Sequence, residues 1–394
     1  MVTPSKLQAF WWNRQGLDGS LDSASAESVL QRAGWARTAG GANPYLTVFS
    51  RAGIRKSAAE SAVDSRTIHE LPSARGCTYV VPQGDFALAL KLATPPAEVP
   101  INTAKKFLGV SEEEVQALCE GILATLAKGA MDPREMKPHL GDLLRNLGDE
   151  GKKRGQTTTL SLGTGRLQAH GKIRRIAVDG RLDGERYKYA LWEGGPEPSS
   201  LTDEEAEDLI AQRYWSWVGL ASLEHFVWFT GFGKRQAEAI IARAGLVGEP
   251  ETGLLGTPEA IQAFTAFQVS NQPQIKLLSS LDSLVLLRRD LAAVLRPKDL
   301  ASEVFREKGP SKVSGLQDMV SNGIFDRGVL IGWWEFDPDA GKIVAKHWVP
   351  PTPQTLNEIE KTEAFIRDEL GDCRSFSLDS PKSRQPLLAW LRGG

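Results

Sequence analysis

The sequence predicts an α+β fold in which helical units precede a C-terminal part rich in β-strands. Helix signals, with capping residues and amphipathic spacing, dominate residues 1–275. From about Lys276 the runs "IKLLSSL", "RGVLIGWWEFD" and "KIVAKHWVP" have the apolar, β-branched and aromatic composition of strands. In addition, residues 158–192 read as a helix followed directly by a hairpin, the order found in a winged helix.

The composition is that of a globular protein. The 394 residues are 41% hydrophobic and 24% charged, and no apolar run approaches the length of a transmembrane helix, about 18 residues. The cysteines Cys77, Cys119 and Cys373 form no CxxC pair and no cluster with histidines, which argues for a reducing compartment and against zinc. The N-terminus has no signal-peptide core. We therefore expect a cytoplasmic monomer with no cofactor, no metal and no membrane contact.

Residues 1–98 are expected to form the first unit. The patterns "SKLQAFWWNRQGL" and "SAESVLQRAG" predict two helices, and Gly34 ends the second as a helix C-cap does. The stretch "GWARTAGGANPYL" then interrupts the helical region, before a helix at "YLTVFSRAG" and a strand at "GCTYVVP". We expect Pro95, Pro96 and Pro100 to form a linker to the next unit.

Residues 99–196 are expected to form a second unit that carries a basic hairpin. Ser111 and Asp132 are placed as helix N-caps, and "GDEGKKRGQ" is expected to be a polar hinge. The sequence concentrates cations on the hairpin and the preceding helix: Arg166, Lys172, Arg174, Arg175, Arg181, Arg186 and Lys188. Such clustering predicts contact with a nucleic-acid backbone, because neutralised phosphates release counterions. The alternative is a solvated ribbon whose cations prevent edge pairing.

Two further parts complete the chain. Residues 197–275 are expected to form three helices, of which the last presents Lys234 and Arg235 either to DNA or to solvent in a structural unit. Residues 276–394 are expected to form the β-rich domain with a terminal helix at "NEIEKTEAFIRDELG" and a mobile tail at "SFSLDSPKSRQP". Within that domain, Trp333 and Trp334 should face opposite sides of one strand, one inward and one outward.

Several landmarks in this order resemble the AlkZ/YcaQ-like DNA glycosylase family, whose members are also described as winged-helix DNA-binding proteins. The landmarks are "RQGL", "LPSARGCTYVVP", "GRLQAHGKIRR", "RYWSWVGLASLEHFVWFTGFGKRQAEAII" and "LLSSLDSLVLLRRDLAAVL". The resemblance implies tandem winged-helix units around a C-terminal β-rich, barrel-like domain, with duplex DNA in the concave face. It also implies hydrolysis of the N-glycosidic bond of an alkylated purine, without a cofactor.

The chain departs from this family at two places. The family's Gln-x-Gln or Gln-x-Asp pair corresponds here to "ARTA", and a one-residue gap leaves open whether Arg37/Ala39 or Ala36/Thr38 are aligned. Neither choice supplies two amides, or an amide and a carboxylate. Tyr79 stands where related sequences have histidine, whereas Arg75 is retained, and both are expected to contact DNA. Tyrosine ordinarily titrates near pH 10 and is a poor general base.

Two functions stay open at this point. In the first, the chain is a glycosylase with a remodelled site, in which Asn43 holds a water, Thr38 assists and Arg37 grips a phosphate. The alternative for Asn43 is that it simply starts the next helix together with Pro44, after a turn made by Gly40 and Gly41. The alternative for Arg37 is a surface charge without a phosphate partner. In the second, the chain is a catalytically inactive DNA-binding protein that recognises shape or damage. A scaffold for protein interaction alone does not explain the basic hairpin.

Overall fold

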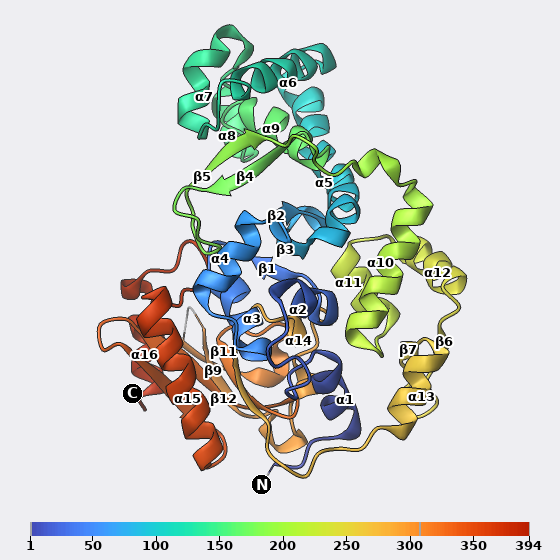
Figure 1. The fold of residues 1–394 in the computed structure, drawn as a ribbon, viewed down its shortest axis with the longest axis vertical. Coiled ribbons are helices and arrows are strands. Elements are labelled where there is room, and N and C mark those ends of the chain that lie inside the picture. Colours follow the sequence, from blue (N-terminus) through green and yellow to red (C-terminus); the bar gives the residue numbers. More distant parts are fainter. Residues whose placement is uncertain (1, 307–308, 394) are drawn as a thin grey trace.

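The computed structural model describes residues 2–306 and 309–393. Figure 1 shows a helical upper lobe formed by the green part of the chain, a column of helices on the right and a sheet with red helices at the lower left. Helices and strands both occur throughout, which confirms the α+β class. In the described part of the chain no helix is long and apolar enough to span a membrane.

The N-terminal region packs helices around a three-stranded antiparallel sheet of order β1-β3-β2. Its elements are α1 (Lys6–Arg14), α2 (Ala26–Ala33), β1 (Ala36–Thr38), α3 (Asn43–Ala52), α4 (Lys56–Asp64), β2 (Ile68–Pro72) and β3 (Thr78–Pro82). The register places Arg37 opposite Tyr79 and Thr38 opposite Thr78. Because side chains alternate along a strand, Arg37 and Tyr79 share one face of the sheet and Thr38 belongs to the other.

A long helix, α5 (Phe86–Leu108), replaces the linker expected at Pro95, Pro96 and Pro100. Each proline removes one backbone donor and costs roughly 3 kcal/mol in a helix interior. The helix nevertheless continues, because its apolar face, including Ile101 and Ala104, is fully buried and packs on α9. The linker prediction is therefore wrong, and the predicted boundary between the first two units falls inside a helix.

The upper lobe contains the helix and hairpin predicted for residues 158–192. Its elements are α6 (Glu112–Leu126), α7 (Pro133–Leu140), α8 (Gly148–Lys153), α9 (Leu160–Ala169), β4 (Ile173–Ala177) and β5 (Tyr187–Leu191). Asp132 caps α7 by accepting from two backbone N–H groups, as predicted, whereas α8 occupies the stretch expected to be a hinge. The helix–hairpin prediction is confirmed at the level of its elements.

The tip of the hairpin is docked on the rest of the molecule. The backbone N–H of Leu182 donates to the hydroxyl of Tyr45 at 2.9 Å, and the Leu182 side chain is buried in the same core as Tyr45. Arg181 donates to the carbonyl of Leu370 at 3.0 Å. The hairpin is therefore held between the N-terminal region and the C-terminal helices.

The three helices predicted for residues 202–245 are present on the right of Figure 1. This region contains α10 (Asp203–Val218), α11 (Leu223–Thr230), α12 (Lys234–Arg243), β6 (Val247–Gly248), β7 (Leu255–Gly256) and α13 (Pro258–Ala266). Thr202 and Glu205 form a reciprocal capping box that starts α10. Three buried residues of α10, Tyr214, Trp215 and Trp217, pack into the core that joins this region to the N-terminal sheet.

The C-terminal region contains a four-stranded antiparallel sheet of order β13-β12-β11-β8. Its elements are β8 (Ile275–Leu278), α14 (Ser283–Leu286), β9 (Glu303–Arg306), β10 (Gly309–Lys312), β11 (Asn322–Asp326), β12 (Val329–Asp337), β13 (Lys342–His347), α15 (Pro353–Phe365) and α16 (Pro381–Leu391). Trp333 and Trp334 are both fully buried, in two different cores. The expectation that one tryptophan faces outward is wrong, because helices cover both faces of the sheet.

The segment expected to be a mobile tail is bound to the loop after β1. The backbone N–H of Ala42 donates to the carbonyl of Arg374 at 2.8 Å, and that of Ser377 donates to the carbonyl of Ala39 at 2.9 Å. The following residues form α16. The tail prediction is therefore wrong, because backbone hydrogen bonds between distant segments leave no local signal in the sequence.

A buried ion pair fixes α3 against α14. Arg51, which is fully buried, donates to both carboxylate oxygens of Asp282, at 2.8 and 2.9 Å. The same carboxylate caps α14 by accepting from Leu284 N–H. A bidentate pair of this kind sets orientation as well as distance, so α14 is held at a defined position beside the loop after β1.

Candidate functional site

The loop that contains Arg37 is shaped by two glycines. Gly40 has a φ of +72°, which L-residues rarely adopt. A Cβ at Gly41 would lie 2.3 Å from the carbonyl oxygen of Ser375, so only glycine permits the close approach of the C-terminal segment. The break between the second and third helices thus provides a short strand, β1, and a turn on which another part of the chain rests.

Arg37 and Tyr79 meet on one face of the N-terminal sheet. Nη1 of Arg37 donates to the carbonyls of Thr38 and Thr78, at 2.9 and 2.7 Å. The guanidinium lies 5.5 Å from the centre of the Tyr79 ring, within range of a cation–π contact. Burial raises the pKa of the Tyr79 phenol well above its ordinary value. Tyr79 is therefore a neutral aromatic surface and hydrogen-bonding group rather than a general base.

These two residues border a cavity of about 260 Å³ at the junction of the N-terminal, third and C-terminal regions. Aromatic and charged side chains line it together: Trp35, Arg37, Arg75, Tyr79, Trp228, Phe229, Asp318 and Phe376. The structure thus brings together Arg37, Arg75 and Tyr79, all predicted from the sequence. Trp228, Asp318 and Phe376 were not singled out from the sequence: Trp228 lies within a family landmark that does not indicate its place at a cavity, and Asp318 and Phe376 come from distant segments that carry no recognisable motif.

Two arginines stack on Trp228 at the cavity. The guanidinium carbons of Arg75 and Arg289 lie 3.5 and 4.0 Å from the centre of its ring. Both arginines have left-handed backbone conformations, with φ of +60° and +54°. Such conformations cost about 1–3 kcal/mol and cluster at functional sites. Gly231 makes room for Arg75, whose Cγ would lie 2.7 Å from a Cβ at that position.

Asn43 and Thr38, the residues predicted to hold water, do not line this cavity. Asn43 is the first residue of α3, is buried, and donates from Nδ2 to the carbonyl of Arg37 at 2.7 Å. Thr38 lies on the other face of the sheet and donates to Oε2 of Glu70 at 3.2 Å. Asn43 therefore starts α3, as its alternative interpretation states, and its side chain also supports the loop, whereas Thr38 contacts Glu70, which lines a second hollow.

That second hollow, of about 160 Å³, lies between β2 and the hairpin. Glu70 lines it together with His69, Arg174 and Arg175, and the Glu70 carboxylate lies 3.8 Å from Nη1 of Arg175. Burial raises the pKa of Glu70, although Arg175 and the Thr38 hydroxyl oppose the shift. Burial also lowers the pKa of His69 to about 4, and Arg174 adds to that effect.

Most of the predicted DNA-binding cations of the upper lobe are engaged within the protein. Arg166 donates to Glu98 and Glu112, so its charge is used to join α9 to α5 and α6. Arg175 stacks on Tyr187 at 4.2 Å. The remaining engaged cations pair with carboxylates, Arg181 with Asp183 and Lys188 with Glu135.

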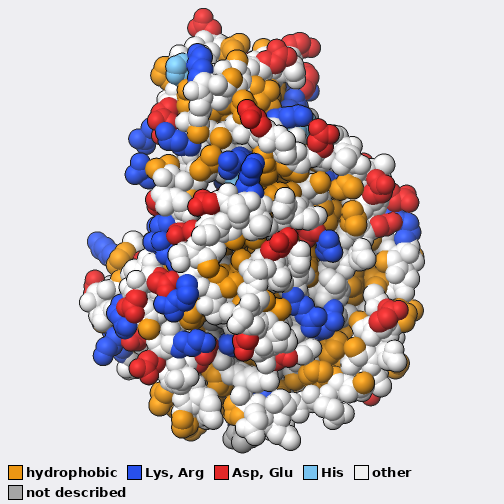
Figure 2. Space-filling model, viewed as in Figure 1, with side chains coloured by type: hydrophobic (Ala, Val, Ile, Leu, Met, Phe, Trp, Pro, Cys, Tyr) orange, Lys and Arg blue, Asp and Glu red, His pale blue; other side chains and the backbone are white. Residues whose placement is uncertain are grey.

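Three hairpin cations, Lys172, Arg174 and Arg186, have no ion-pair partner in residues 2–306 and 309–393. Lys172 and Arg186 are also exposed. Figure 2 shows Lys and Arg side chains gathered where the hairpin meets the N-terminal sheet, with acidic side chains interspersed over the rest of this face. Fewer cations are available to a phosphate backbone than the sequence suggests.

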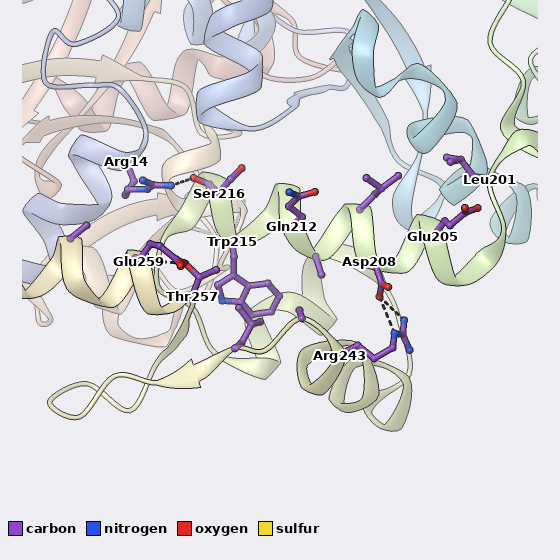
Figure 3. A pocket seen from close by; sticks show the side chains of 16 residues that line it. Arg14, Leu201, Glu205, Asp208, Gln212, Trp215, Ser216, Arg243, Thr257 and Glu259 are labelled. Carbon is purple, nitrogen blue, oxygen red and sulfur yellow. Dashed lines mark hydrogen bonds and ion pairs between the residues drawn. The ribbon is translucent and has the colours of Figure 1, made fainter.

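The largest hollow, about 940 Å³, lies elsewhere and contains none of the predicted site residues. Figure 3 shows it beside α10, with Trp215 at its centre and Arg243 joined to Asp208 at one end. Arg243 is also paired with Glu207, so the groove offers little free positive charge. Lys234 and Arg235 are exposed at the start of α12, outside this groove.

In the part of the chain that the structure describes, no group of three or more His, Cys, Asp or Glu side chains is arranged to hold a metal ion. The polar and aromatic groups at the 260 Å³ cavity are its aromatic walls, three arginines around it and one carboxylate.

Comparisons with known proteins agree with this architecture. The model of the family described as DNA glycosylase AlkZ-like matches residues 30–376. Among solved structures, the Streptomyces sahachiroi DNA glycosylase AlkZ superposes with a TM-score of 0.67 at 17% sequence identity, over 95% of this chain and 99% of that chain. None of the curated proteins matches the chain in sequence.

Proposed function

The chain belongs to the DNA glycosylase AlkZ-like family, and from this premise we propose that it binds duplex DNA and hydrolyses the N-glycosidic bond of an alkylated purine. The observation that carries the proposal is the cavity in which Arg37, Arg75 and Tyr79 meet a set of aromatic side chains. Three of the residues predicted from the sequence of the N-terminal region, Arg37, Arg75 and Tyr79, converge there, whereas Thr38 and Asn43 do not.

The lining of the cavity suits a base that has left the helical stack. Enzymes that act on a nucleobase extrude it from the duplex and hold it between aromatic or apolar side chains. Trp35, Tyr79 and Phe229 provide such surfaces here, and base–aromatic stacking is worth about 1–3 kcal/mol per base. Arg37 is placed to hold a phosphate or a polar edge of the extruded nucleotide.

The substrate class follows from what β1 lacks. Neither Arg37 nor Ala39 supplies the amide or carboxylate of the family's usual pair. An N3- or N7-alkylated purine is cationic and therefore already a good leaving group, so its release requires mainly positioning and electrostatic stabilisation of the sugar. We infer that such cationic lesions are the substrates.

Contact with the duplex is assigned to the hairpin and α12. Lys172, Arg174 and Arg186 carry charge that no carboxylate of the described chain neutralises, and Lys234 and Arg235 are exposed. Such cations gain affinity for DNA by releasing counterions from phosphates. In this assignment, helix α9 and the β4-β5 hairpin act as a winged helix, as the sequence predicts.

The test is single-turnover base release from methylated duplex DNA. The proposal expects free N3- or N7-methylpurine and an abasic site in the presence of excess protein. Release from unmodified DNA at an equal rate would contradict the substrate class, and no release from any methylated duplex would contradict the enzymatic function.

A second candidate is a DNA-binding protein without catalysis. It is favoured by one observation, namely that Arg37 lies on β1 with its Nη1 held by two backbone carbonyls, where the family has a catalytic side chain. The same assay separates the two candidates when it is combined with a binding titration. Tight, lesion-dependent binding without base release supports this second function.

A further inference from the structure

We propose that Asp318 is the carboxylate that positions and deprotonates the hydrolytic water in this site. The inference rests on the proposed base excision and names the group that replaces the missing pair. Asp318 lies on the loop before β11, far in sequence from β1, and lines the same cavity as Arg37 and Tyr79.

The two oxygens of this carboxylate are in different situations. Oδ2 accepts from Nε of Arg289 at 2.8 Å. Oδ1 is covered by protein and has no hydrogen-bond partner among the described residues, although the side chain as a whole is 39% exposed. A buried polar atom without a partner is rare and calls for an explanation such as a catalytic role or a bound water. The cavity that Asp318 lines has room for a water, which occupies about 30 Å³ in the liquid, and rotation of the carboxylate would bring Oδ1 to it.

The residues around Asp318 hold it rigidly. Arg289, its ion-pair partner, stacks on Trp228, and Nε1 of Trp228 donates to the carbonyl of Leu286 at 3.1 Å. The backbone carbonyl of the neighbouring residue Gln317 accepts from the backbone N–H of Leu291 at 3.1 Å. Catalytic groups need such support, because a carboxylate that is free to move loses its alignment with the reacting atoms.

The chemistry balances without a further reactant. Water held by Oδ1 forms a bond to the anomeric carbon of the deoxyribose, and one of its protons passes to Asp318. The N-glycosidic bond breaks, and its electron pair leaves with the alkylated purine, which departs as a neutral base. The carboxylate also stabilises the positive charge that develops on the sugar as the bond breaks.

The test compares Asp318→Asn with Asp290→Asn in single-turnover release of a methylated purine. Asparagine keeps an oxygen that accepts from Arg289 and removes the charge. Asp290 is a matched control, because its side chain has the same 39% exposure but pairs with His225 outside the cavity. We expect Asp318→Asn to slow release by roughly 10²–10⁴-fold, the usual contribution of acid–base assistance, and Asp290→Asn to release at the wild-type rate.

Binding and a second variant separate the possible outcomes. Asp318→Asn should bind the methylated duplex as tightly as the wild type, and Asp318→Glu, which keeps a displaced carboxylate, should release faster than Asp318→Asn even if both are less stable. Wild-type release by Asp318→Asn overturns the role of Asp318 and leaves the proposed function intact. Absence of release by the wild type overturns the proposed function, and this inference with it.

Discussion

Each face of the β1-β3-β2 sheet has an arginine and a carboxylate beside it, but the two pairs differ in their partners. On one face, Arg37 borders a cavity with aromatic walls and Asp318, whose Oδ1 has no partner within the described residues. On the other, Glu70 accepts from Thr38 and lies near Arg175 in a smaller hollow. On the first face the polar groups border a cavity, whereas on the second face they join the sheet to the hairpin.

This difference follows from the period of a strand. Neighbouring residues on β1 point to opposite faces, so a shift of one residue in the alignment moves a side chain from one hollow to the other. The sequence leaves both Arg37/Ala39 and Ala36/Thr38 open as the equivalents of the family's pair. The observed register puts Arg37 at the 260 Å³ cavity and turns Thr38 to the opposite face, where it donates to Glu70.

The largest expected effect is on the rate of base release, and it should distinguish Arg37 from its neighbour Thr38. Arg37→Met should slow base release by roughly 10²–10³-fold, because a preorganised donor is lost from an enclosed site and no amide replaces it. Thr38→Val should release base at close to the wild-type rate and lower the free energy of unfolding by about 0.5–1.5 kcal/mol, since Glu70 loses a donor. Single-turnover release and urea unfolding measure the two effects. Equal slowing by both variants would contradict the assignment of separate roles to the two faces.

The sequence predicts the elements of this molecule better than their contacts. The helix and hairpin at residues 158–192 follow from a change of hydrophobic period, and the three helices at 202–245 follow from their caps. The prolines of α5 mislead, because tertiary packing on α9 outweighs local propensity.

The site itself is predicted only in part, for a physical reason. Arg37, Arg75 and Tyr79 lie in or near the strands of one sheet, so local motifs find them. Asp318 and Phe376 reach the cavity through the tertiary fold, in the stretch "KVSGLQDMVSNG" and in the segment expected to be mobile. Charge counting also overestimates the free cations, because it does not reveal that Arg166 and Arg181 have carboxylate partners.

A second prediction tests whether the smaller hollow is structural, through the pH dependence of stability. His69 is buried beside Trp192, and burial lowers its pKa from 6.5 to about 4. The unfolded chain takes up a proton near pH 6.5 and the folded chain only near pH 4, so stability falls as the pH is lowered through this window. The slope is at most about 1.4 kcal/mol per pH unit, and the total is at most about 3 kcal/mol.

His69→Phe should remove this contribution while preserving the aromatic packing. The difference in unfolding free energy between wild type and variant, measured by urea titration from pH 7.5 to 4, should therefore change in favour of the variant as the pH falls. Parallel curves over the whole range would mean that His69 takes up its proton at the same pH in the folded and unfolded chain, so that burial does not lower its pKa.

A third prediction concerns the turn that connects β1 to the C-terminal segment. Gly41→Ala places a Cβ against the backbone of Ser375 and should lower the free energy of unfolding by about 1–3 kcal/mol, a typical cost of overpacking. Residues 372–379 should also become more sensitive to protease. Gly165→Ala is the control, because its Cβ meets nothing within 4 Å in α9, and it should stabilise by about 0.4–1 kcal/mol. An equally stable, equally protected Gly41→Ala would show that the segment does not depend on this contact.

The smallest expected effect is on the salt dependence of DNA binding by the hairpin beside the second face. Some hairpin cations have no carboxylate partner and are free to contact DNA, whereas others are held in ion pairs. Lys172→Gln with Arg174→Gln should weaken binding to any duplex and reduce the slope of log affinity against log salt by about 0.9 for each lost phosphate contact. Arg181→Gln removes one positive charge from the same hairpin, but Arg181 is held by Asp183 and the Leu370 carbonyl. It should therefore lower stability and leave the slope unchanged. A salt titration of binding to unmodified duplex measures both slopes, and a flatter slope for Arg181→Gln than for the double variant would mean that DNA displaces the internal partners of Arg181.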